Sequence, residues 1–278
     1  MKIKLAISTC PNDTFIFDAL VNKRLNTGGY NFDVTLADIQ ELNNLALSGD
    51  VDMVKISYAL YPIISKDYQL LTAGSALGEG VGPLVVSKRK VYPDEVEHTK
   101  IAIPGQTTTA NFLLSLAFPK AIDKKVYLFS DIEEAVLQNE VDVGVLIHEG
   151  RFTYRQKGLF KVMDLGDFWE KTTSSPIPLG GIAIRRNLPD KVKQELNALT
   201  RQSVEYALTN TGSALPFVKQ HAQEMDEQVI LNHIELYVND FSVNLGERGK
   251  QAVLKMLEKS SSLEQYKGVE LTEPFFLC

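Results

Sequence analysis

Hydrophobic and polar residues alternate along the first 150 positions as they do in a protein built from strands and helices in turn. Short apolar runs predict strands at 2–8, 30–36, 51–57, 83–87, 100–103, 126–129 and 141–147. Apolar residues at helical spacing predict helices at 14–22, 39–48, 110–117 and 132–138. Gly49 stands where a glycine often ends a helix. This alternation predicts an α/β fold with mainly parallel sheets.

The pattern changes after residue 188, where helical spacing dominates. Helices are predicted at 190–208, 213–223, 226–238 and 247–259. We expect these C-terminal helices to pack back on the first part of the chain.

The two halves of the strand-helix region resemble one another. Leu5-Ala6-Ile7-Ser8, a polar loop and the helix from Thr14 match Ile101-Ala102-Ile103-Pro104, a polar loop and the helix from Ala110 without a gap. A second match joins the Asp38-Ile39-Gln40-Glu41 segment to Asp131-Ile132-Glu133-Glu134. Both halves therefore repeat the same order of strand, polar loop and helix.

Two similar α/β lobes, with the chain returning to complete the first, predict a periplasmic-binding-protein-like (type II) fold with C-terminal helices. We expect one lobe to contain residues 1–86 and 187–278, and an inserted lobe to contain 87–186. In this architecture the ligand lies in a cleft at the carboxyl ends of the strands. A length of 278 residues is in keeping with two lobes.

Net charge, cysteine content and the length of apolar runs limit the kinds of partner and the cellular location that are expected. The net charge of −6 argues against a nucleic-acid partner, because phosphate binding needs a basic surface and Lys88-Arg89-Lys90 is only a short cluster. Cys10 and Cys278 suggest neither a disulfide framework nor a zinc ribbon. The apolar run before Cys10 is too short for an export signal, and no stretch reaches the length of a membrane span. We expect a cytoplasmic protein without a membrane partner.

We call the expectation that ligands bind at the carboxyl ends of strands the strand-end rule. It selects four cleft segments, each of which follows a predicted strand: Ser8–Asp13, Ser57-Tyr58, Gln106–Thr109 and His148-Glu149. Asn12 or Asp13 is expected to cap the helix near Thr14, and Thr107, Thr108 and Thr109 surround the start of the helix at Ala110. Two helix starts facing one cleft favour a carboxylate or phosphate ligand, although capping alone also explains each start. Lys55 either reaches solvent or anchors such an anion.

His148 is the candidate general base, because it alone among the four histidines stands at a predicted strand end. His98 lies in a charged stretch, His221 in a surface-like helix, and His233 in an apolar helical pattern typical of a core residue. Zinc-protease, serine-hydrolase and nucleotide-binding motifs are not found, so no metal or cofactor is expected. The Gly78-x-Gly80-x-Gly82 run precedes a strand, which favours backbone flexibility where the chain crosses between lobes.

A series of motifs in order resembles the 1,4-dihydroxy-6-naphthoate synthase family of the futalosine menaquinone route. The motifs are Ser8-Thr9-Cys10-Pro11-Asn12-Asp13-Thr14-Phe15, Lys55-Ile56-Ser57-Tyr58, Gly80-Val81-Gly82-Pro83, Thr108-Thr109-Ala110, Ile147-His148-Glu149-Gly150-Arg151-Phe152, Pro178-Leu179-Gly180-Gly181 and Tyr237-Val238-Asn239-Asp240. They span nearly the whole chain.

The resemblance implies a cofactor-free carbon–carbon lyase that converts cyclic dehypoxanthinyl futalosine, a small carboxylate substrate, into 1,4-dihydroxy-6-naphthoate. It implies that His148 accepts the proton and that Lys55, Ile56, Ser57, Thr109 and Ala110 contact the substrate, and we add Asn12, Asp13 and Thr108 as binding candidates. Two alternatives remain: a solute-binding protein for a small carboxylate, which would need export, and the related chorismate dehydratase.

Overall fold

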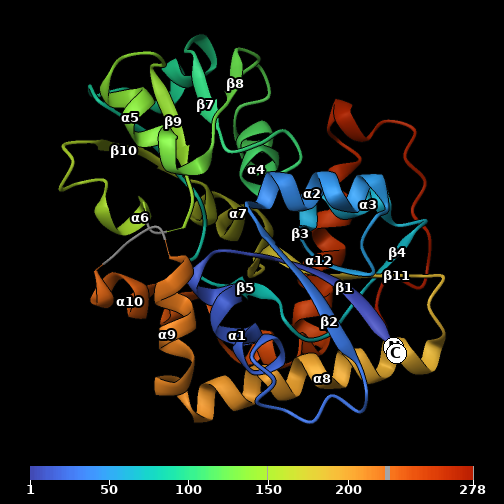
Figure 1. The fold of residues 1–278 in the computed structure, drawn as a ribbon. Coiled ribbons are helices and arrows are strands. Elements are labelled where there is room, and N and C mark those ends of the chain that lie inside the picture. Colours follow the sequence, from blue (N-terminus) through green and yellow to red (C-terminus); the bar gives the residue numbers. More distant parts are fainter. Residues whose placement is uncertain (149, 223–225, 278) are drawn as a thin grey trace. The chain divides into compact units, whose positions relative to one another are not determined.

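The computed structural model describes residues 1–148, 150–222 and 226–277, and Figure 1 shows its elements in chain order. The chain divides into two compact units, which are described separately. The first contains Met1–Gly78 and Pro178–Cys278, and the second contains Glu79–Ile177. The boundaries expected at residues 86 and 186 lie elsewhere because Leu84–Ser87 pairs within the sheet of the second unit, whereas Gly180–Arg185 pairs within that of the first.

A mixed sheet forms the first unit. Its strands are β1 (Lys2–Ser8), β2 (Asn31–Ala37), β3 (Met53–Ser57), β4 (Tyr68–Leu70), β5 (Ala76–Gly78) and β11 (Ile177–Arg185), in the order β2-β1-β3-β11-β4 with β5 on β11. β1 runs parallel to β2 and β3, but β11 runs antiparallel to β3 and β4. The expectation of mainly parallel sheets is therefore only partly met, because β11 brings the chain back from the second unit in the opposite direction.

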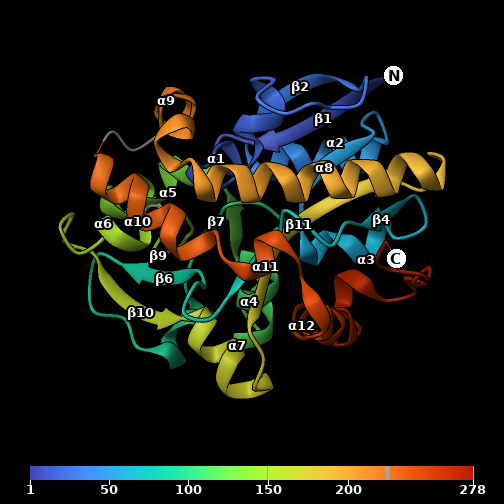
Figure 2. The same cartoon turned by 90° about the horizontal axis from the view of Figure 1, so that it is seen from below.

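Helices complete the core of the first unit. They are α1 (Pro11–Val21), α2 (Ile39–Ser48), α3 (Tyr61–Ile64), α8 (Asp190–Thr209), α9 (Thr211–His221), α10 (Glu227–Tyr237), α11 (Asp240–Val243) and α12 (Gly246–Ser260). α1 packs against α8, α9 and α10, and its contact with α8 is visible in Figure 2. The C-terminal helices thus pack on the first part of the chain, as expected. The expected helix 213–223 ends at His221, and residue 223 lies outside the described residues.

The second unit also has a mixed sheet. Its strands are β6 (Leu84–Ser87), β7 (Ile101–Ile103), β8 (Lys124–Val126), β9 (Val143–Leu146) and β10 (Phe160–Asp164), in the order β10-β6-β9-β7-β8. Its helices are α4 (Thr109–Ala117), α5 (Ile132–Leu137), α6 (Gly150–Thr153) and α7 (Leu165–Thr173). β7 is parallel to β8 and β9, whereas β6 is antiparallel to β9 and β10. The ring of Trp169 on α7 lies 6.5 Å from that of Phe112 on α4.

Within the described residues, no helix combines the length and the apolar character that a membrane crossing requires.

Candidate functional site

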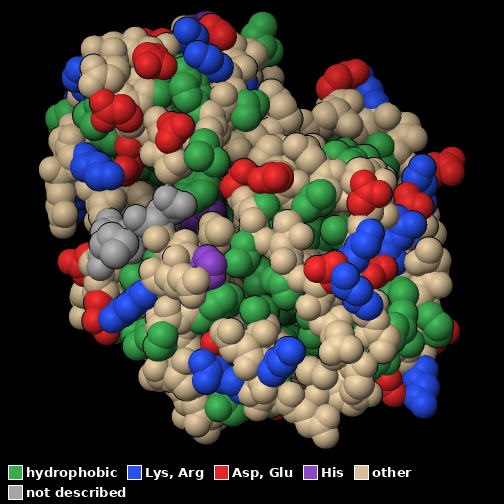
Figure 3. Space-filling model, in the orientation of Figure 1, with side chains coloured by type: hydrophobic (Ala, Val, Ile, Leu, Met, Phe, Trp, Pro, Cys, Tyr) green, Lys and Arg blue, Asp and Glu red, His purple; other side chains and the backbone are tan. Residues whose placement is uncertain are grey.

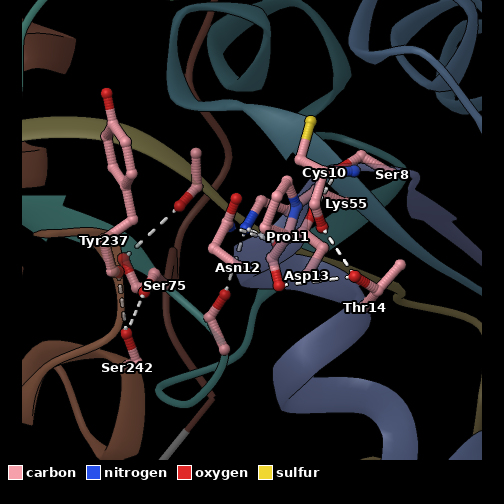
Figure 4. Close-up of polar contacts among 12 residues, drawn as sticks. Ser8, Cys10, Pro11, Asn12, Asp13, Thr14, Lys55, Ser75, Tyr237 and Ser242 are labelled. Atoms are coloured by element: carbon pink, nitrogen blue, oxygen red, sulfur yellow. Dashed lines mark hydrogen bonds and ion pairs between the residues drawn. The ribbon is translucent and has the colours of Figure 1, made fainter. Parts of the chain in front are cut away.

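Parallel pairing in the first unit brings two strand ends together. β1 ends at Ser8 and β3 at Ser57, and because these strands run in the same direction, their carboxyl ends lie at one edge of the sheet. α1 begins three residues after β1, so its first turn lies at the same edge. Figure 4 shows Lys55 of β3 beside this Ser8–Thr14 segment, with the sulfur of Cys10 directed away from the polar contacts.

The start of α1 differs from the expected one. The helix begins at Pro11 with Cys10 as N-cap, and no side chain caps it. Asn12 and Asp13 lie in its first turn, so the expectation that either caps a helix near Thr14 is wrong. Proline suits the first helical position because its φ is already near the helical value and it has no N–H to satisfy. This extends the helix three residues towards the strand.

Asp13 and Lys55 form a buried ion pair. Asp13 is 1% exposed and Lys55 is 4% exposed, and 2.6 Å separates the lysine Nζ from Asp13 Oδ1. Ser8 Oγ donates to Asp13 Oδ2 at 2.6 Å, and Asn12 Nδ2 donates to Asp13 Oδ1 at 2.8 Å. The charge of Lys55 is therefore balanced inside the protein, an arrangement that neither interpretation of Lys55 anticipated.

This pair also changes the electrostatics of the helix start. The exposed N–H groups at the beginning of a helix favour a negative charge. At α1 the protein supplies that charge itself, because the Asp13 carboxylate lies in the first turn. The start of α1 therefore has less capacity to attract an anionic ligand than its position alone suggests.

Ser57 is held by a residue that the sequence analysis did not select. Asn43 of α2 is fully buried, and its amide donates to Ser57 Oγ at 3.2 Å and accepts from Ser57 N at 3.0 Å. Ile56, the preceding residue, is fully buried within β3. Asn43 stands between Leu42 and Ala46 on the buried face of its helix. A polar residue on the apolar face of a predicted helix was the sequence signal that could have identified Asn43.

The glycine pair of β11 makes room for two side chains of the β3 edge. Gly180 pairs with Ser57 and Gly181 with Ile56. A Cβ on Gly181 would lie 2.6 Å from the Tyr58 ring, and one on Gly180 would lie 3.1 Å from Lys55 Cε. Burial raises the pKa of the Tyr58 hydroxyl, which is 2.9 Å from Ser75 Oγ. Close packing therefore explains why glycines occupy these positions.

In the second unit the corresponding edge carries the other predicted residues. Thr108 is the N-cap of α4, since its hydroxyl accepts from Asn111 N at 3.3 Å and donates to Gly105 O at 2.8 Å. Thr109 and Ala110 follow in the first turn, and all three predicted residues are buried. Capping by a threonine, the alternative explanation of this helix start, is therefore observed at Thr108.

Lys124 supports the same loop from β8. Its Nζ donates to Asn111 Oδ1 at 3.0 Å and to Ser115 Oγ at 2.7 Å. Asn111 in turn donates to Gln106 O at 2.8 Å, which connects the lysine to the loop before α4. Burial lowers the pKa of Lys124. The loop is thus fixed by two polar side chains that the sequence analysis did not select.

His148 follows β9 at the carboxyl edge of β7, β8 and β9. Its φ is +53°, a left-handed conformation that few residues other than glycine adopt, although histidine is enriched among them. The ring is half-buried and packs edge to face on Phe129, with 4.9 Å between ring centroids. The adjoining Glu149 lies outside the described residues. The predicted base therefore has a defined position at a strand end.

Charge on the visible surface is mixed. Lys and Arg side chains are interspersed with Asp and Glu over the face drawn in Figure 3. In the described part of the chain, no group of three or more His, Cys, Asp or Glu residues is placed to hold a metal ion.

The comparisons with known proteins agree over nearly the full length of the chain. A family model described as "Menaquinone biosynthesis" matches residues 3–262. Two proteins named 1,4-dihydroxy-6-naphthoate synthase are similar: the one from Thermus thermophilus is 42% identical, with 94% of each chain covered, and the one from Streptomyces coelicolor is 41% identical, with 94% of this chain and 93% of that protein covered.

Solved structures identify the fold. The crystal structure of protein AF1704 from Archaeoglobus fulgidus has a TM-score of 0.88 and 34% identity, covering 94% of this chain and 97% of that one. The alkanesulfonate-binding protein SsuA from Xanthomonas axonopodis pv. citri has a TM-score of 0.72 at 10% identity, covering 99% and 97%. The predicted periplasmic-binding-protein-like α/β fold is confirmed.

Proposed function

This chain belongs to the menaquinone-biosynthesis family whose model spans residues 3–262, and on that premise we propose that it forms 1,4-dihydroxy-6-naphthoate from cyclic dehypoxanthinyl futalosine. The observation that carries the proposal is the similarity to two synthases of that name at 42% and 41% identity, each aligned over 94% of this chain. The reaction is a carbon–carbon bond cleavage that leaves an aromatic product. A cytoplasmic location and a small carboxylate substrate are part of the same proposal.

His148 is the proposed general base. A base must present a ring nitrogen to the proton that it removes, and it must be held in place. His148 is half-buried at the end of β9, and the edge-to-face contact with Phe129 restricts its ring. Unusual backbone conformations of non-glycine residues are found disproportionately at functional sites, and the φ of +53° is in keeping with this role.

The proposed binding residues divide into two groups with different chemistry. In the first unit, Ser57 offers a hydroxyl whose direction Asn43 fixes, and Lys55 offers an N–H within a neutral ion pair. In the second unit, Thr109 and Ala110 offer the backbone N–H groups of the first turn of α4. These helix-start donors favour a substrate oxygen that carries negative charge. The carboxylate of the substrate is the group we assign to them.

The test is turnover of cyclic dehypoxanthinyl futalosine by the purified protein, with the product identified by its absorption and mass. Formation of 1,4-dihydroxy-6-naphthoate supports the proposal. Binding of the compound without product would favour a solute-binding protein. Formation of 3-enolpyruvylbenzoate from chorismate, with no reaction of the futalosine derivative, would favour a chorismate dehydratase.

Replacing His148 tests its role within that assay. We expect His148→Asn to lower kcat by about 10²–10⁴-fold with little change in KM, because a positioned base contributes that factor. Asparagine is chosen because it tolerates the left-handed backbone but does not act as a base near neutral pH. His98→Ala is the control, since His98 is an exposed histidine of the same unit. Near-normal turnover by His148→Asn would refute the assignment.

A further inference from the structure

The buried hydrogen-bond network of the first unit extends beyond the proposed site to a histidine of α10. His233 is fully buried, and its Nε2 lies 2.9 Å from Asn12 Oδ1. The ring centroid of His233 is 4.5 Å from that of Tyr237, one turn further along the helix and labelled in Figure 4. His233 and Asn12 are 221 positions apart in sequence. The sequence analysis treated His233 as a core residue only.

The directions of the hydrogen bonds in this network follow from chemistry. A carboxylate accepts hydrogen bonds but cannot donate them. Asn12 must therefore turn its NH₂ group to Asp13, where the distance is 2.8 Å, and its carbonyl oxygen to His233. An oxygen can only accept, so the proton of this hydrogen bond belongs to His233 Nε2. The reversed amide would place two acceptors against one another at Asp13.

The network ends at Lys55. Asp13 Oδ1 accepts from both Asn12 and Lys55, and Lys55 Nζ also lies 3.4 Å from Gly74 O. Two of the three N–H groups of Lys55 thus have partners within the protein. The third is the one that the proposed function assigns to the substrate. The direction of that N–H depends on where Asp13 is held.

We propose that His233 is a positioning residue of this site: its Nε2–H fixes the amide of Asn12, and Asn12 holds Asp13 so that Lys55 keeps one N–H directed for binding. This inference rests on the proposed function for its effect on catalysis. The hydrogen-bond direction on which it depends is independent of that function.

Substitution of His233 separates hydrogen bonding from packing. His233→Leu removes the donor and leaves the buried Asn12 oxygen unsatisfied, and we expect kcat/KM to fall about 5- to 30-fold, mainly through KM. His233→Gln keeps an N–H donor on a flexible side chain, and we expect it to restore most of the loss. Ile230→Val is the control, because Ile230 is a buried residue of the same helix that makes a core contact without a polar group. It should lower stability without changing KM.

A second measurement is independent of turnover. In protein labelled with ¹⁵N-histidine, the long-range ¹H–¹⁵N spectrum shows which ring nitrogen carries the proton, and His233→Gln identifies the His233 signals. A proton on Nε2 supports the proposal, and an unprotonated Nε2 overturns it. Unchanged KM in a folded His233→Leu variant would also overturn it. If the wild-type protein forms no product, the proposed function fails, and the spectrum alone decides the role of His233 in the network.

Discussion

Removing either member of the Asp13–Lys55 pair should destabilise the protein strongly. The pair is almost completely buried, with 1% and 4% of the two residues exposed. Within the described residues, Lys55→Met leaves the Asp13 carboxylate with only Ser8 and Asn12 as hydrogen-bond donors, and Asp13→Asn leaves the ammonium group without a counter-charge. Breaking a buried pair in this way costs about 3–5 kcal/mol, because one charge remains in a poorly solvated place. We therefore expect a loss of that size from each single substitution.

The double variant Asp13→Asn/Lys55→Met removes both charges, so its loss should be smaller than the sum of the two single losses by at least about 2 kcal/mol. The assay is urea unfolding followed by far-ultraviolet circular dichroism. The matched control is Asp33→Asn, which breaks the exposed pair Lys2–Asp33, 2.8 Å apart in the same unit, and should change stability little. Additive losses in the double variant, or single losses no larger than that of Asp33→Asn, would refute the reasoning.

Two further substitutions test packing and pH dependence. Gly181→Ala should destabilise by about 1–3 kcal/mol in urea unfolding, because its Cβ would lie 2.6 Å from the Tyr58 ring; Gly212→Ala, at a helical site with open space around it, should not destabilise. Burial raises the pKa of Tyr61 to about 12, so between pH 10 and 12 the folded protein keeps a proton that the unfolded chain loses. Stability should therefore fall as pH rises through this window, by roughly 1.4 kcal/mol per pH unit for this group. Tyr61→Phe should show a shallower fall, and an unchanged slope would contradict the assignment.

Local signals explain which elements were predictable. The predicted bounds of α2 agree with the structure because each end of the helix has a capping residue that marks it in the sequence. Asp38 accepts from Gln40 N and Glu41 N at the start, and Gly49 adopts a left-handed φ of +74° at the end. These interactions involve residues within a few positions of each other. A sequence therefore displays them directly.

The elements between α6 and α8 were not predicted, although α7 does have a local start signal, because Asp164 accepts from Gly166 N and Asp167 N in its first turn. β10, α7 and β11 occupy Phe160–Asp164, Leu165–Thr173 and Ile177–Arg185. β11 contains Pro178 and the glycine pair, which ordinarily argue against a central strand. The strand forms because β3 and β4 pair with it on either side, and because the glycines admit Lys55 and Tyr58. The strands and side chains that stabilise β11 are more than a hundred positions away in sequence, so the local sequence pattern does not predict this strand.

For the candidate site, the sequence likewise predicted where residues lie but not which of them contact one another. The strand-end rule selected Asp13 and Ser57, because the end of a strand is a local property that parallel pairing turns into a shared edge, whereas Lys55 was a separate candidate two residues before Ser57. The rule did not pair Asp13 with Lys55, although Asp13 lies in the first turn of the helix that follows β1 and Lys55 lies in the adjacent buried strand β3. A buried lysine needs a counter-charge within reach, so an acidic residue in the segment that follows a neighbouring strand should be tested as its partner before a ligand is invoked. Under the proposed function, the ion pair with Asp13 favours hydrogen bonding over charge attraction as the role of Lys55, and the start of α4 is the position we propose for the substrate carboxylate.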